Sequence, residues 1–219
     1  MKLAFYSMMF FMCMSIALNA QETNVYDPNA KKLLDDISTS TKGMEPLKVE
    51  FTYLLDNKAT KVKETNQGNI VIEGSKYVLN MGKIQMFCDG KAVYTYLSQN
   101  DEMQINNIST EADALNPATL FTAYQKGFKY ALKKDEVING TTYQVVELYP
   151  ENLKKKYSKI QILVNKTKKQ IYSFKTFGKD GTNYEIVVKT LGAKVKVDSK
   201  FFAVDMSKFP NAEVVDLRE

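Results

Sequence analysis

The stretch Gly68–Leu97, GNIVIEGSKYVLNMGKIQMFCDGKAVYTYL, decides the fold of this chain. It holds four short apolar segments, which are separated by turn signals at Glu73-Gly74-Ser75, Met81-Gly82-Lys83 and Asp89-Gly90. Short apolar segments joined by glycine-containing turns are typical of β-hairpins. We therefore predict a series of antiparallel strands across this stretch.

The large apolar residues of each segment fall on alternate positions, with polar residues such as Asn69, Asn80 and Gln85 between them. Successive side chains of a strand point to opposite faces, so this alternation predicts an antiparallel sheet with one apolar face and one wet face. The residues predicted on the apolar, aromatic face are Ile70, Ile72, Tyr77, Leu79, Met81, Ile84, Met86, Cys88, Tyr94 and Tyr96.

The N-terminus has the pattern of a secretory signal. Lys2 precedes an apolar run from Leu3 to Leu18, and Ala20 offers a small residue for cleavage. The apolar run is somewhat short for a membrane span, which needs roughly 20 apolar residues. We therefore expect residues 1–20 to be a signal peptide that is cleaved near Ala20, and residues 21–219 to form an exported, soluble domain.

Cysteine usage agrees with a fold that depends on its core alone. The chain has two cysteines, Cys13 and Cys88, and cleavage of the signal would leave only Cys88, so no intramolecular disulfide is expected. Cys88 alternates in register with Ile84 and Met86. This position predicts a small buried hydrophobic residue rather than a reactive thiol.

The charge of the chain is mildly basic. Its formal net charge is +5, the excess is nearly all lysine, and Arg218 is the only arginine. Nucleic-acid and phosphate sites use arginine for bidentate contacts, so the composition argues against a nucleic-acid partner. We expect the Lys154-Lys155-Lys156 run to be a solvated turn rather than a docking patch.

An amphipathic helix is predicted between the signal and the strands. Asp27-Pro28 suits its start, because aspartate caps a helix and proline fits the first turn, and Gly43 marks its end. Leu33, Leu34 and Ile37 lie at helical spacing and give it a narrow apolar stripe.

A second helix is predicted from Asn116-Pro117 to Gly127. Its apolar residues Leu120, Phe121 and Tyr124 lie at spacings of three and four. A helix inserted between strands must lie on a sheet face or project as a lid.

The rest of the chain from Val49 onward has an apolar period of two, which predicts about eleven short strands. The segment 58–67 has the composition of a polar connection, and the apolar pairs of the tail, 201–219, predict that the tail packs against the domain. The fold class expected is mainly β (α+β), one domain whose antiparallel sheet is large enough to curl.

The chain contains no histidine, which excludes histidine-based triads, histidine general bases and the usual zinc sites. It has no glycine-rich phosphate-binding motif, and its acidic residues fall mainly in turns and on the polar faces of strands. We therefore expect no enzyme, no catalytic residues, no metal and no cofactor.

The apolar sheet face can serve either as a packed core or as a cavity wall. An aromatic stripe is more often core than pocket, so the residues alone favour two helices that fill this face. The two helices nevertheless carry few apolar residues for the area of about eleven strands, which leaves room for a ligand.

The order of elements resembles a known family. The residues that carry the resemblance are the N-terminal helix, the hairpin of Gly68-Asn69-Ile70 and Lys76-Tyr77, Cys88-Asp89-Gly90-Lys91 followed by Tyr94 and Tyr96, Asn116-Pro117, and the closing Val215-Asp216-Leu217-Arg218. Together they resemble the LolA-type periplasmic outer-membrane lipoprotein carriers over nearly the whole chain after residue 20.

The resemblance implies an incomplete antiparallel β-barrel of about eleven strands with a lid of short α-helices. It also implies a monomeric periplasmic carrier that takes lipoprotein acyl chains from an ATP-driven inner-membrane transporter and passes them to an outer-membrane acceptor. The cavity and lid residues expected on this basis are Phe51, Tyr53, Ile70, Ile72, Tyr77, Leu79, Tyr94, Tyr96, Leu120, Phe121 and Tyr124.

Two positions depart from the family pattern. Family members carry an arginine near the turn between the second and third strands, where it ties the barrel to the lid, but this chain has Gly74 there and Lys76 as the nearest cation. Tyr94 stands in place of a family tryptophan. Two other functions stay open, namely a periplasmic carrier of another lipid and a sensor that binds a lipidated partner.

Overall fold

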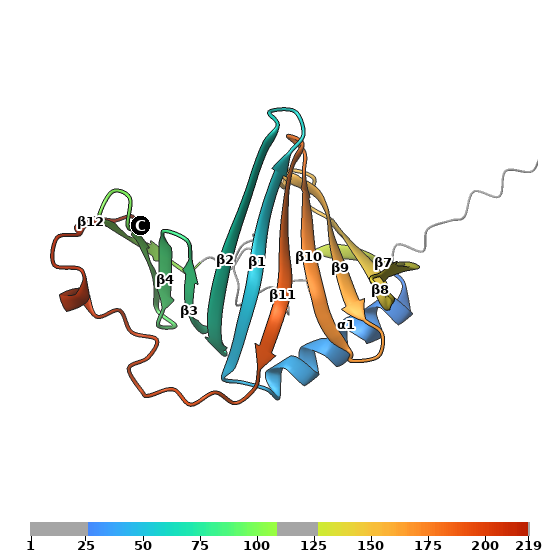
Figure 1. The fold of residues 1–219 in the computed structure, drawn as a ribbon, viewed down its shortest axis with the longest axis horizontal. Coiled ribbons are helices and arrows are strands. Elements are labelled where there is room, and N and C mark those ends of the chain that lie inside the picture. Colours follow the sequence, from blue (N-terminus) through green and yellow to red (C-terminus); the bar gives the residue numbers. More distant parts are fainter. Residues whose placement is uncertain (1–25, 109–126, 219) are drawn as a thin grey trace, which may run out of the picture.

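The computed structural model describes residues 26–108 and 127–218 (Figure 1). It contains the helix α1 (Pro28–Lys42), a short 3₁₀ helix (Met206–Lys208) and twelve strands. The strands are β1 (Leu47–Asn57), β2 (Val62–Glu73), β3 (Lys76–Met81), β4 (Ile84–Cys88), β5 (Ala92–Leu97), β6 (Glu102–Asn107), β7 (Phe128–Ile138), β8 (Thr141–Pro150), β9 (Tyr157–Asn165), β10 (Gln170–Gly178), β11 (Thr182–Gly192) and β12 (Glu213–Asp216).

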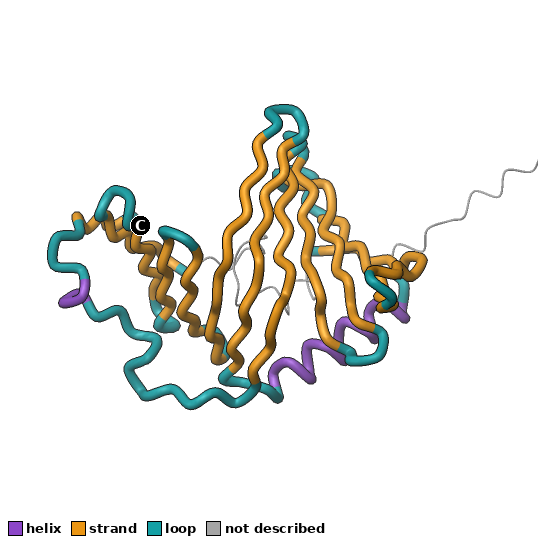
Figure 2. Tube along the Cα trace, in the orientation of Figure 1, coloured by secondary structure: helices purple, strands orange, loops and turns teal. Residues whose placement is uncertain are grey.

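All twelve strands belong to one sheet, in the order β12-β6-β5-β4-β3-β2-β1-β11-β10-β9-β8-β7. Neighbouring strands are antiparallel except for β12, which is parallel to β6. The sheet curls and stays open, with β12 and β7 at its two ends (Figures 1 and 2). This confirms the prediction of a mainly β, incomplete antiparallel barrel.

The stretch Gly68–Leu97 forms the end of β2 and all of β3, β4 and β5, as the alternation predicts. Its first two turns are tight, because Glu73 pairs with Lys76 and Met81 pairs with Ile84. In the third turn the carboxylate of Asp89 accepts hydrogen bonds from the backbone N–H groups of Lys91 and Ala92, at 2.7 and 3.0 Å. Side chain-to-backbone bonds of this kind fix the chain reversal without a regular two-residue hairpin.

The polar segment 58–67 is not a connection throughout, and this prediction is wrong. β2 begins at Val62, and its polar residues pair with β1 from Asn57↔Val62 onward. The backbone hydrogen bonds of an antiparallel ladder form regardless of side-chain polarity, so a strand near a sheet end can be polar.

The helix α1 forms as predicted. The side chain of Asp27 accepts hydrogen bonds from the backbone N–H groups of Asn29 and Ala30, Pro28 occupies the first turn, and Gly43 follows the last residue. Its stripe of Leu33, Leu34 and Ile37 is buried against the sheet. The partners of this stripe are Phe128, Val146, Leu148, Ile160, Ile162, Val164, Ile171 and Phe174, from β7 to β10.

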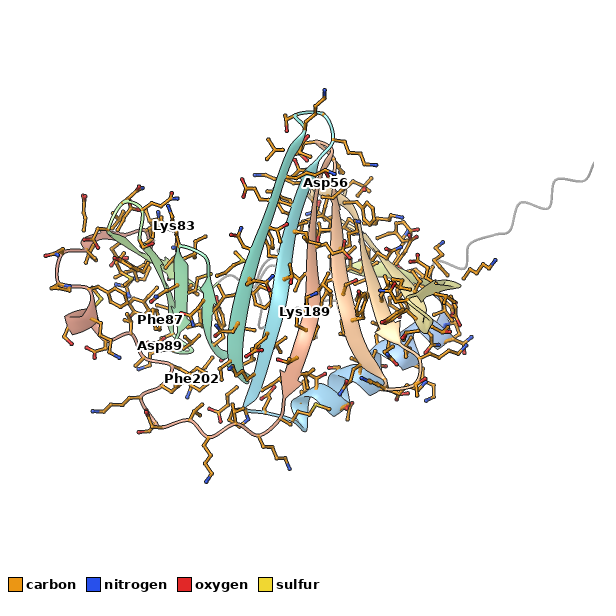
Figure 3. The ribbon with its side chains drawn as sticks, viewed as in Figure 1. Asp56, Lys83, Phe87, Asp89, Lys189 and Phe202 are labelled. Atoms are coloured by element: carbon orange, nitrogen blue, oxygen red, sulfur yellow. The ribbon has the colours of Figure 1, made fainter. Side chains whose placement is uncertain are left out.

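We call the face of the sheet that α1 covers the inner face. The opposite, outer face carries part of the C-terminal segment, which leaves β11, passes the lower ends of β1 to β3 and reaches β12 beyond β4 (Figure 1). Phe202 is buried against Val71 and Val78 of the outer face, and Phe209 packs on Phe87 and Tyr96. Figure 3 labels Phe202 and Phe87. The prediction that the tail packs is confirmed, and its last part adds a strand beside β6.

Gly68 of β2 lies opposite Phe51 of β1, whose ring covers it. A Cβ at position 68 would lie 2.5 Å from the Phe51 ring and 3.0 Å from the carbonyl oxygen of Asn80. We expect Gly68→Ala to lower the free energy of unfolding by about 1–3 kcal/mol in urea titrations, because the buried ring must move. Asn69→Ala, the neighbouring position on the outer face, should cost less, and an unchanged stability of Gly68→Ala would contradict the close contact.

Glu147 is a buried carboxylate on the outer face of β8. It accepts hydrogen bonds from Lys159 and Tyr149, and Lys133 lies 3.7 Å away. Burial raises its pKa, but the hydrogen bonds and the two lysines outweigh burial and leave the pKa below the ordinary value. A lowered pKa stabilises the fold at neutral pH, and this contribution is lost as the pH falls below about 4.

We expect Glu147→Gln to reduce the loss of stability on acidification. Unfolding free energies of the two proteins, measured by urea titration between neutral pH and the acid limit of folding, should differ most at neutral pH and converge in acid. Curves that stay parallel would contradict a stabilising charged Glu147.

No helix among the described residues is long and apolar enough to cross a membrane. The predicted signal, residues 1–20, and the predicted helix carrying Leu120, Phe121 and Tyr124 lie outside the described residues.

Candidate functional site

The inner face of the sheet away from α1 is the candidate site. Cross-strand pairing places Phe51 opposite Gly68, Ile70 opposite Leu79, and Ile72 opposite Tyr77, so these side chains share one face. Pairing continues the face across β4, β5 and β11. The buried residues of this cluster are Leu47, Val49, Phe51, Ile70, Ile72, Tyr77, Leu79, Cys88 and Val93.

Helix α1 covers the other half of the inner face, over β7 to β10, and none of its residues belongs to this cluster. The inner face is therefore divided into a half that one helix fills and a half that is lined by half-buried apolar side chains. The half-buried residues packed against the cluster are Met44, Tyr53, Met81, Met86, Ile108, Ile186, Val188 and Leu191.

A pocket of about 380 Å³ opens at the end of this apolar half, next to the β3–β4 and β5–β6 loops. Its apolar wall consists of Met81, Ile84 and Leu97, which share the inner face by register. Its polar wall includes Glu64 and Asn66, which lie on the same face through their pairing with β1. A pocket with one apolar and one polar wall suits a ligand that has an apolar body and a polar head.

Tyrosines bring hydroxyl groups to an otherwise apolar surface. The rings of Tyr53 and Tyr184 stack with centroids 6.2 Å apart. Burial, with smaller contributions from Tyr184 and Glu64, raises the pKa of Tyr53 to about 12. Burial also raises the pKa of Tyr77, which is 2% exposed, so both phenols stay neutral at physiological pH.

Cys88 is buried in the same cluster, at 1% exposure, and its thiol donates a hydrogen bond to the carbonyl oxygen of Ser75 at 3.3 Å. Burial raises the pKa of this thiol, which disfavours the reactive thiolate. The prediction of a small buried hydrophobic residue is confirmed.

Tyr94 and Tyr96 do not lie with the other predicted site residues, and this part of the prediction is wrong. Cys88 of the inner face pairs with Val93, so Val93 and Thr95 point inward, while Tyr94 and Tyr96 pair with Phe87 and Gln85 on the outer face. Tyr96 packs on Phe209 of the C-terminal segment. Cys88 pairs with Val93 across four intervening residues, and an even number of turn residues keeps Val93 on the face of Cys88; only an odd number would have turned Tyr94 and Tyr96 inward.

The remaining predicted residues of the described chain, Phe51, Tyr53, Ile70, Ile72, Tyr77 and Leu79, do share the inner face. Tyr184, Ile186 and Val188 of β11, which pair with β1 and complete the wall, were not among the predicted site residues. Their own alternation was visible in the sequence, but the pairing of β1 with β11 joins distant parts of the chain. No local signal specifies that pairing.

The turn at Gly74 is held differently from the pattern expected of the family. Gly74 has a φ of +59°, a conformation that glycine adopts without strain, and its N–H donates a hydrogen bond to the Glu45 carboxylate at 2.7 Å. Arg218, the only arginine of the chain, donates hydrogen bonds from its guanidinium to the carboxylate of Asp216, the last residue of β12. Glu45 therefore ties this turn to the segment between α1 and β1.

A second pocket, about 690 Å³, lies on the outer face between β3–β4 and the C-terminal segment. Phe87 and Phe209 contribute apolar surface, but Asp198, Lys200 and Asp205 also line it. Within residues 26–108 and 127–218, no three acidic or cysteine side chains come together as a metal site would require.

Comparison with known proteins agrees with this architecture. The structure is similar to an uncharacterised conserved protein from Thermus thermophilus, with a TM-score of 0.55 and 9% identity, over 86% of this chain and 99% of that chain. A LolA superfamily protein from Nitrosomonas europaea matches with a TM-score of 0.44 and 11% identity, over 78% and 96%. The lipoprotein LppX from Mycobacterium tuberculosis matches with 0.48 and 13%, over 78% and 100%.

No curated protein sequence matches the chain. At 9% identity, the match to the Thermus thermophilus protein shows a shared fold alone. The family model described as "Outer membrane lipoprotein carrier protein LolA" matches residues 42–205, which is most of the chain. The chain therefore belongs to the LolA family of outer membrane lipoprotein carrier proteins.

Proposed function

We propose that this protein is a periplasmic carrier that binds the acyl chains of lipoproteins and shuttles them from the inner membrane to the outer membrane. The observation that carries the proposal is the divided inner face. One helix fills the half over β7 to β10, whereas the half over β11 to β5 presents half-buried Tyr53, Met86, Ile186 and Val188 beside a pocket lined by both apolar and polar side chains.

The energetics of acyl chains explain why such a face is useful. Each methylene exposed to water costs about 0.8 kcal/mol, so a chain of about 16 carbons left in water costs on the order of 12 kcal/mol. A lipoprotein that crosses an aqueous compartment therefore needs an apolar surface to cover its chains. The aliphatic and thioether side chains of β4 and β11 provide this surface.

Release at the destination requires that binding is not too tight. The hydroxyl groups of Tyr53 and Tyr184 and the polar groups of Glu64 and Asn66 interrupt the apolar wall. These groups lower the gain from burial relative to a purely aliphatic wall. The exchange consists of binding and release, so it requires no covalent chemistry and no catalytic residue.

The proposed function also includes export of the protein and transfer of its cargo. Residues 1–20 would direct export and be cleaved near Ala20, and residues 21–219 would act as a monomeric carrier in the periplasm. An ATP-driven inner-membrane transporter would load the carrier, and an outer-membrane acceptor would receive the lipoprotein.

A displacement assay tests the binding step directly. The exported protein is loaded with a fluorescent fatty acid, and a synthetic triacylated lipopeptide is added as the competitor. We expect the lipopeptide to displace the probe, while the same peptide without acyl chains should not. Equal displacement by the two peptides, or no uptake of the probe, would contradict the proposal.

A further inference from the structure

One end of the sheet gathers lysines and exposed apolar side chains in a way that the cavity does not explain. We call this end the loop rim, and it consists of the loops β1–β2 (58–61), β3–β4 (82–83), β5–β6 (98–101), β8–β9 (151–156) and β10–β11 (179–181). The pairing of Asn57 with Thr182 joins the first loop to the last, and a backbone hydrogen bond from Lys179 to Lys156 adds the β8–β9 loop. These three loops are therefore continuous, whereas the β3–β4 and β5–β6 loops, which a backbone hydrogen bond from Ser98 to Lys83 joins, lie further down the sheet, level with Gly68.

Leu153 is the most exposed large apolar residue among those the structure describes, at 80% exposure. It lies in the β8–β9 loop and directly precedes Lys154-Lys155-Lys156. Val62, which follows the β1–β2 loop, is 43% exposed. Single exposed apolar residues are common, so exposure alone does not indicate a site.

The backbone around Leu153 is nevertheless held in place. Asn152 accepts a hydrogen bond from the backbone N–H of Lys154 at 2.9 Å, and its carbonyl accepts one from Lys155 at 3.2 Å. The ammonium of Lys179 donates to the carbonyl oxygen of Leu153. These bonds fix a turn that presents Leu153 outward instead of letting it fold back onto the sheet.

The charge of the rim is strongly one-sided. Its loops contain the lysines 58, 61, 83, 154, 155, 156 and 179, against the acidic residues Glu151, Asp101 and Asp180. The carboxylate of each acidic residue accepts a hydrogen bond from a neutral group. Glu151 accepts from the Tyr26 hydroxyl, Asp101 from the Tyr96 hydroxyl, and Asp180 from the backbone N–H of Thr182. Lys83 lies at this end of β4, whereas Asp89 lies at the other end (Figure 3).

We propose that the loop rim docks on an anionic lipid surface, with Leu153 inserted among the headgroups. The lysines can pair with the anionic headgroups of a membrane, and the exposed apolar side chain can enter the hydrocarbon region beneath them. Lys83 and Asn100, in the β3–β4 and β5–β6 loops, also line the pocket described above.

The test uses flotation of the cargo-free exported protein with two kinds of vesicle. One kind contains phosphatidylcholine only, and the other contains phosphatidylcholine and phosphatidylglycerol in equal parts. We expect binding to the anionic vesicles only, and we expect high salt to weaken it. Absence of binding to anionic vesicles would overturn the proposal.

Two variants with matched controls locate the contact. Leu153→Ser should weaken binding by about tenfold or more, whereas Val137→Ser, which removes a 69% exposed apolar side chain on β7, should not change it. Replacing lysines 154, 155 and 156 by glutamine should weaken binding by on the order of a hundredfold. The same change at lysines 166, 168 and 169, in the β9–β10 loop at the opposite end, should have little effect.

Equal losses of vesicle binding in the rim variants and in their controls would show that the protein binds by general charge attraction. This result would overturn the docking site. The inference is independent of the cavity function. A protein that fails to bind vesicles but still takes up the fluorescent fatty acid would overturn the rim and leave the carrier proposal intact.

Discussion

Ile186→Glu is expected to weaken binding of an acyl-chain probe by at least about a hundredfold, because a carboxylate facing the chain must be buried without a partner. Ile186 lies on β11, pairs with Tyr53 across the inner face and is half-buried. Its side chain therefore contributes to the wall without being fully enclosed in the core. Titration of a fluorescent fatty acid into the two proteins measures the effect.

Leu54→Glu provides the matched control for this variant. Leu54 is also half-buried and lies on β1 next to Tyr53, but it points to the outer face opposite Glu185. Lys175, which lies 3.2 Å from Glu185, can compensate the added charge. Equal affinity of Ile186→Glu and Leu54→Glu for the probe would contradict an acyl-binding inner face.

Phe202→Ala is expected to lower the free energy of unfolding by about 3–5 kcal/mol, the usual cost of removing a buried phenylalanine side chain. Phe202 is 5% exposed and packs on Val71 and Val78, which lie opposite each other on β2 and β3. It anchors the segment between β11 and β12 to the outer face. Urea denaturation measures the change.

Amide hydrogen exchange distinguishes a local loss of stability in β12 from a global loss of stability in this variant. If Phe202 anchors the segment, amides of β12 should exchange faster in Phe202→Ala than in the parent protein, since among the described strands β12 pairs with β6 alone. Met206→Ala, at a 38% exposed position of the same segment, should behave like the parent protein. Unchanged exchange in β12 would contradict the anchoring role.

The alternating stretch Gly68–Leu97 allowed much of the fold to be predicted. Ile70, Ile72, Tyr77 and Leu79 alternate with polar residues between short turns, so both strand positions and the shared face could be inferred. The start of α1 was predictable for a similar reason, because Asp27 and Pro28 form a local signal. These features depend on neighbours within a few residues.

The positions of Tyr94 and Tyr96 could not be inferred in this way. The segment Ala-Val-Tyr-Thr-Tyr-Leu has apolar residues at both parities, so its inward face depends on whether the preceding turn holds an odd or an even number of residues. The hydrogen bonds of Asp89 fix that number, and they are a property of the folded turn. The wall residues Ile186 and Val188 depend in turn on pairing between β1 and β11, which are distant in sequence.

The gathering of lysines in the loop rim could not be predicted from the sequence either. Lys154-Lys155-Lys156 alone indicates a solvated turn, because runs of lysine are common in exposed loops. The fold places this run next to Lys179 and near the β1–β2 loop. Only the sheet order brings these lysines to one end.

Mass spectrometry of the protein purified from its native envelope tests the central claim most directly. The complex is released in mild conditions, and organic extracts and co-purifying proteins are analysed in parallel. We expect diacylated or triacylated lipoproteins in near-stoichiometric amount with the carrier. A protein that carries only free lipids, or that is recovered empty, would contradict a lipoprotein carrier.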